Sequence, residues 1–84
     1  MPARPHSIRF SLEYDTDRLA ETVAASLDNE VGEINDDRSR TTLSRERSTV
    51  CIDVEAADLV ALRAASNTWL SLADVAERTV QAAE

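Results

Sequence analysis

Alternation of apolar and polar residues predicts three β-strands. In residues 7–13 and 49–56 every second position is apolar, the pattern of a half-buried strand. A weaker strand is predicted at residues 38–45, joined to the next by a tight turn and suited to the edge of a sheet. The inward positions are Ile8, Phe10, Leu12, Thr41, Leu43, Val50, Ile52, Val54 and Ala56.

An amphipathic helix is predicted between the first two strands. Asp15 or Thr16 is suited to cap its N-terminus, and apolar residues at a spacing of three and four continue to about Asn29. Residues 29–37 hold the only glycine of the chain and four acidic residues, which indicates a connecting loop. The spacing of these acids does not match a calcium-binding loop.

The predicted order of elements is strand, helix, strand, strand, helix, which defines an α+β fold. Two helices on one face of a three-stranded antiparallel sheet make a two-layer domain. The right-handed crossover rule places the third strand in the middle of the sheet. The chain of 84 residues suffices for one such domain, which we assign to residues 6–84. Residues 1–5, which contain both prolines, are expected to form a disordered tail.

The last helix, predicted for residues 57–83 with a cap near Asp58, is more apolar than one sheet requires. On a helical projection its polar residues occupy an arc only about 80° wide. A helix that lies on a sheet needs an apolar stripe of roughly 100°. The surplus predicts a helical interface with another chain, although the first helix can cover part of it. Trp69, the sole tryptophan, is suited either to anchor that interface or to fill the core.

The chain is strongly acidic and contains no lysine. Sixteen acidic residues face nine arginines, for a formal net charge of -7. Both an ordinary acidic surface that resists aggregation and adaptation to high salt account for this composition. The single cysteine, Cys51, excludes an internal disulfide and fits a reducing cytoplasm, where we expect the protein to reside. No apolar run approaches the ~20 residues of a membrane span.

Residues suited to catalysis or metal binding are sparse. His6 is the only histidine, and Cys51 lies on the outward face of a strand with no second histidine to activate it. The common metal-binding and phosphate-binding motifs are absent from the sequence, so we expect no catalytic residue, metal or cofactor. Four arginines cluster within ten residues and could contact phosphates or pair with nearby acids. They are Arg38, Arg40, Arg45 and Arg47.

Residues 53–70 resemble the Pcc-type subunit of the KEOPS complex. That family has a strand that ends in alanine, an aspartate at the helix start, Leu-Arg, and then Asn followed by a small hydroxyl residue and a leucine. The matching residues here are Ala56, Asp58, Leu62, Arg63, Asn67, Thr68 and Leu70. The resemblance extends over nearly the whole chain from about residue 7, and the acidic, lysine-free composition resembles the haloarchaeal members. Arg47 departs from the pattern, because many relatives have a glycine in this hairpin.

The resemblance implies a non-catalytic dimerisation subunit. A homodimer would dock the threonylcarbamoyl-transferase subunit and so support threonylcarbamoyladenosine modification of tRNA next to the anticodon. A Rio-type kinase and its activator would be indirect partners, and tRNA would be contacted within the complex. The alternative is a small RNA-binding module built on the four arginines. The residues expected at the partner surface are Leu62, Arg63, Ser66, Asn67, Trp69, Leu70, Ala73 and Asp74.

The acidic composition predicts a fold that depends on salt. Because the carboxylates repel one another at low ionic strength, we expect Tm, followed by far-UV circular dichroism, to rise with KCl concentration. In a domain of this size each ~1 kcal/mol of added stability raises Tm by roughly 4–8 °C. A Tm that stays constant across the KCl series would contradict adaptation to high salt.

Overall fold

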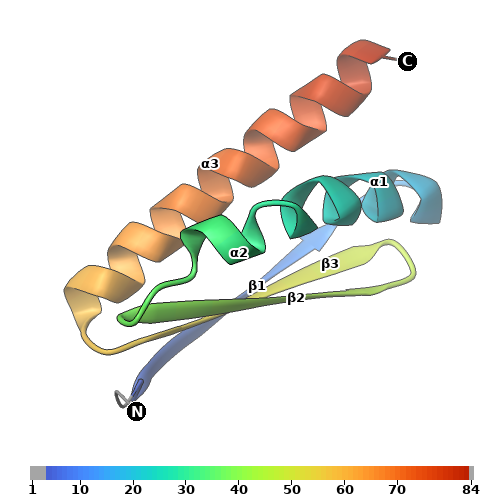
Figure 1. Cartoon of the computed structure of the whole chain (residues 1–84). Helices are drawn as coiled ribbons and strands as arrows, with labels where there is room; N and C mark the ends of the chain where they lie inside the picture. Colours follow the sequence, from blue (N-terminus) through green and yellow to red (C-terminus); the bar gives the residue numbers. More distant parts are fainter. Residues whose placement is uncertain (1–3, 84) are drawn as a thin grey trace.

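The computed structural model describes residues 4–83, which form one antiparallel sheet covered on one face by helices (Figure 1). The strands lie in the order β1-β3-β2, so the third strand is central, as predicted. The two-layer α+β architecture is confirmed. Residues 1–3 of the predicted tail lie outside the described part. The elements are β1 (His6–Glu13), α1 (Asp17–Asp28), α2 (Val31–Ile34), β2 (Ser39–Glu46), β3 (Thr49–Ala56) and α3 (Leu59–Ala83).

Side-chain caps fix where the two long helices begin. The Thr16 hydroxyl accepts a hydrogen bond from the Leu19 amide at 3.1 Å, which satisfies one of the free amides of α1. The Asp58 carboxylate accepts one from the Ala61 amide at 2.7 Å and does the same for α3. The sequence left Asp15 or Thr16 open for the first cap, and the structure selects Thr16; the second cap was predicted near Asp58.

The hairpin between β2 and β3 turns through Arg47 and Ser48. Arg47 has φ of 57°, in the left-handed region that glycine adopts more readily than other residues. The arginine therefore keeps the backbone conformation of the turn at some cost in free energy.

The short helix α2 was not predicted, because residues 29–37 were interpreted as a loop. Its single turn is closed by hydrogen bonds from the Ile34 amide to the Glu30 carbonyl and from the Asn35 amide to the Val31 carbonyl, both at 3.1 Å. Val31 and Ile34 pack against the core, so tertiary contacts hold a helix that is too short to be stable by itself.

The core lies between the inner face of the sheet and the helices α1 and α3. Trp69 is its largest side chain and is fully buried. The other buried members of the core cluster are Ala20, Val23, Leu27, Val50, Ile52, Val54, Ala65, Ala73 and Ala76. The inward positions predicted for β3 are confirmed, since all four are buried. The α3 face that carries Trp69 is therefore the face that packs on the sheet.

Trp69→Ala should destabilise the single chain. Truncation of a fully buried tryptophan costs about 3–5 kcal/mol, whereas Leu70→Ala, at a 39% exposed neighbour, should cost under ~1.5 kcal/mol. Urea unfolding followed by circular dichroism measures both, at a protein concentration low enough to keep the chain monomeric. Equal losses in the two variants would contradict the assignment of Trp69 to the core.

Candidate functional site

Large apolar side chains remain exposed on two flanks of α3. Leu59 and Leu70 are 61% and 39% exposed and lie about 20° apart on a helical projection. Val60 and Val75 are 73% and 57% exposed and lie about 60° apart, farther around the helix. A polar arc separates the two pairs, and Arg63, Asn67 and Asp74 are three of its exposed members.

The flank with Leu59 and Leu70 faces β1, and we call it the β1-side flank. Glu77, at about the same helical angle as Leu59, lies close to Tyr14 at the end of β1. Burial and the negative charge of Glu77 together raise the pKa of Tyr14 to about 12. Ile8 on β1 is also 40% exposed, although its alternation pattern directs it toward the helices. Apolar surface is thus exposed on both α3 and β1 along this side.

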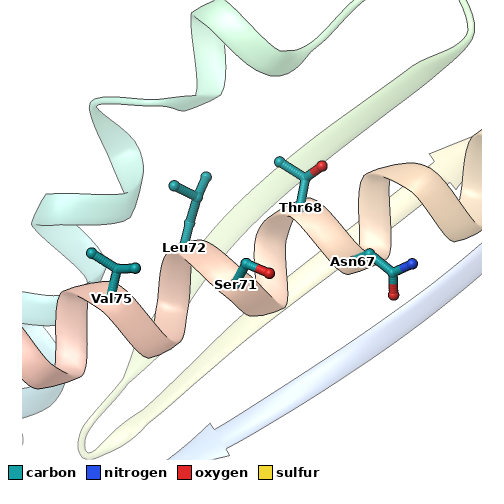
Figure 2. A pocket seen from close by; sticks show the side chains of 5 residues that line it. All are labelled: Asn67, Thr68, Ser71, Leu72 and Val75. Carbon is teal, nitrogen blue, oxygen red and sulfur yellow. The ribbon is translucent and has the colours of Figure 1, made fainter.

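The opposite flank faces α2 and carries a shallow apolar groove. Figure 2 shows Thr68, Leu72 and Val75 projecting toward the same side of α3, with Asn67 and Ser71 completing the lining. A second hollow continues toward the start of α3, where Val60 and Ala64 lie beside Ile34 of α2. We call this surface, defined by Val60, Ala64, Thr68, Leu72 and Val75, the α2-side flank.

The outer edge of β1 has backbone groups that can accept another strand. The Tyr14 amide bonds the Ser48 carbonyl at 2.9 Å, which shows that even-numbered residues on this side turn their backbone groups toward β3. The odd-numbered residues therefore direct theirs outward. They are Ser7, Arg9, Ser11 and Glu13. Across residues 4–83, no other strand pairs with this edge.

The predicted partner residues divide between the core and the surface. Ser66, Trp69 and Ala73 are buried inside the single chain and do not offer a solvent-facing surface. Their contact with a partner stays a prediction. Three-and-four spacing is common to a helix that packs on a sheet and one that packs on another helix, so the sequence pattern alone does not distinguish the two.

The remaining predicted partner residues are accessible. Arg63, Asn67 and Leu70 are exposed, and Leu62 is half-buried. Asp74 is exposed and forms an ion pair with Arg78 one turn later. Their contact with a partner stays a prediction. Val60 and Val75 were not among the predicted partner residues, although their place away from the Trp69 face would have distinguished them.

The four clustered arginines do not form one patch. Arg38 pairs with Asp58, and the Ala61 amide together with Arg38 holds the pKa of that carboxyl below its usual range. Arg45 lies on the helix side of β2, 4.0 Å from Glu21 of α1, whereas Arg40 lies on the open face of the sheet. Arg40 and Arg47 form no ion pair with any described side chain. A nucleic-acid contact through these arginines stays a prediction.

The other chemically reactive residues lie apart. Cys51 is half-buried on the open face of β3, with its sulfur 3.8 Å from the Ser11 hydroxyl. His6 is five residues from Ser11 along β1, beyond the reach of that thiol. Over the described residues, no group of three or more His, Cys, Asp or Glu side chains could hold a metal ion. In the same part of the chain, no helix is long and apolar enough to cross a membrane.

These features define a small two-layer α+β domain that exposes a strand edge and two apolar helix flanks. The chain belongs to the Pcc1 family: residues 7–81 match the family model described as transcription factor Pcc1. The resemblance to the Pcc-type KEOPS subunit is thereby confirmed.

A solved chain from the crystal structure of the binary complex Gon7-Pcc1 has a similar fold. Its TM-score is 0.84 at 13% sequence identity, over 98% of this chain and 100% of that one. At this identity the likeness shows the fold alone. The comparison with curated proteins found no match.

Proposed function

We propose that this chain is an accessory, non-catalytic subunit of the KEOPS complex. In this role it pairs with a second copy and docks the threonylcarbamoyl-transferase subunit, which modifies adenosine next to the tRNA anticodon. The observation that carries the proposal is the pair of exposed flanks on α3, because large apolar side chains are costly to leave in water. Family membership supplies the identity of the complex.

The transferase is assigned to the α2-side flank. Leu72 and Val75 line a shallow groove on α3, and Val60 lines the hollow that continues it, a shape that accepts the apolar face of a partner helix. The polar arc with Asn67 borders this groove and would form the hydrated rim of the interface. Residues of the family motif thus contribute to the border of the contact rather than to its centre.

The second copy is assigned to the β1 side. A strand that pairs antiparallel with its own copy creates a two-fold symmetric contact, in which each chain uses the same surface. The free edge of β1 provides the backbone groups, and Ile8 and Leu70 provide apolar surface beside it. Six strands would then form one continuous sheet.

In this proposal the transferase is the catalytic subunit. The Rio-type kinase and its activator would be indirect partners, connected to this chain through the transferase. The subunit would supply dimerisation and a surface for tRNA. Arg40 and Arg47 are the two arginines of β2 and its hairpin that form no ion pair with a described carboxylate, so they are the candidates for phosphate contact.

Val75→Glu should abolish capture of the transferase without unfolding the subunit. A carboxylate in the centre of a desolvated helical interface costs at least about 2 kcal/mol, or roughly 30-fold in Kd. Co-purification of the two subunits, followed by titration calorimetry, measures the loss. Leu70→Glu, on the opposite flank, is the matched control and should retain the transferase. Loss of binding in Leu70→Glu but not in Val75→Glu would contradict the assignment of the flanks.

The same two variants should have the reverse effect on self-association. Light scattering of the wild type should give twice the 9.2 kDa of one chain, and Leu70→Glu should lower it to one chain. Ser11→Pro should do the same, because it removes an outward amide and leaves the bonds between β1 and β3 intact. Val75→Glu should remain dimeric. A wild type that is monomeric at tens of micromolar in high salt would exclude the proposed pair.

A further inference from the structure

The two edges of the sheet differ in how much of their backbone is free. On β2 the odd-numbered residues direct their backbone groups away from β3, since the Arg38 carbonyl and its even-numbered neighbours bond the central strand. This outer edge would be as open to strand addition as β1 if nothing covered it. The segment between α2 and β2 changes this.

Two consecutive residues, Asn35 and Asp36, bond half of the outward backbone groups of β2. The Thr41 amide donates to Oδ1 of Asn35 at 2.8 Å, and Nδ2 of Asn35 donates to the Thr41 carbonyl at 3.3 Å. The Ser39 amide donates to Oδ1 of Asp36 at 2.9 Å, and the Asp36 amide donates to the Ser39 carbonyl at 3.1 Å. Four outward backbone groups are therefore bonded as a neighbouring strand would bond them.

The helix α2 holds this segment in place. Asn35 is the residue that ends α2, and its extended conformation, with ψ of 134°, follows the helical turn directly. Val31 and Ile34 anchor the same turn in the core. The Asn35 amide group is thus positioned by packing, and an incoming strand would have to displace it.

We propose that Asn35 and Asp36 block strand addition at β2, so that the sheet can extend only at β1. The inference adds to the proposed pairing of two copies, because a chain with two open edges can add further copies at each end. An incoming strand gains little at a blocked edge, since each new hydrogen bond replaces one that already exists. The second copy at β1 then closes the assembly at two chains.

Amide hydrogen exchange of the wild-type protein tests directly whether the block forms. The outer edge of β2 carries the backbone amides of Ser39, Thr41, Leu43 and Arg45. Only the amides of Ser39 and Thr41 have side-chain acceptors. We expect the Ser39 and Thr41 amides to exchange at least tenfold more slowly than those of Leu43 and Arg45. Equal exchange at all four positions would show that the block does not form.

Removal of the block should make the mass of the assembly increase with protein concentration. For the variant with both Asn35→Ala and Asp36→Ala, light scattering should give masses above that of the wild type, and the amides of β2 should gain protection as concentration rises. Asp37→Ala, at an exposed neighbour, should leave the mass unchanged. A folded double variant with the wild-type mass at every concentration would overturn the proposal.

A milder variant keeps the proposal testable if the double variant does not fold. If the double variant loses its far-UV spectrum, the mass is measured on Asn35→Asp, which keeps the acceptor for Thr41 and removes the donor, with the same two outcomes. The wild-type mass alone tests the proposed pair. A monomeric wild type with a self-associating variant would refute that pair and leave the edge block supported.

Discussion

The packing of one long helix on a short sheet is the constraint on which the rest of this structure depends. The 25 residues of α3 span roughly 37 Å, whereas strands of eight residues span about 26 Å. The sheet covers one stripe of α3, centred on Trp69, and α1 packs beside it. Since no further layer exists in the described chain, the apolar side chains on either side of that stripe stay in contact with solvent.

This constraint explains why both surfaces available for assembly lie on α3 or beside it. Trp69 fixes how the helix is rotated on the sheet, and that rotation decides which residues become flanks. Leu70 is exposed because Trp69 is buried, and Val75 is exposed because it lies well away from the buried face. A change that rotated α3 would therefore alter both flanks together.

The fold was largely predictable because its elements carry simple periodic signals. Strict alternation located β3, and capping residues at Asp15 or Thr16 and near Asp58 located the helix starts to within a residue. The helix α2 has only one turn and carries no periodicity that a sequence can reveal. The two hydrogen bonds between the Asn35 side chain and the Thr41 backbone depend on where that turn places the side chain, which no local pattern encodes.

The functional surface was less predictable, for reasons that follow from geometry. Apolar residues at helical spacing mark a buried stripe without showing whether the same chain or a partner buries it. Trp69, which suited either an interface or the core, is buried in the core of the single chain. The arginines near one another in sequence separated because alternate residues of a strand face opposite sides, which places Arg40 and Arg45 on different faces of β2.

The polar arc between the two flanks has a consequence for assembly. Arg63, Asn67 and Asp74 separate the apolar surface on the β1 side from that on the α2 side, so a partner on one flank leaves the other accessible. Two partners that shared one continuous stripe would compete for it. In the proposed role, separate flanks would instead allow one chain to hold a second copy and a larger subunit together. A chain with one domain and a thin core would then act as a connector, because its longest helix exposes two separate apolar flanks.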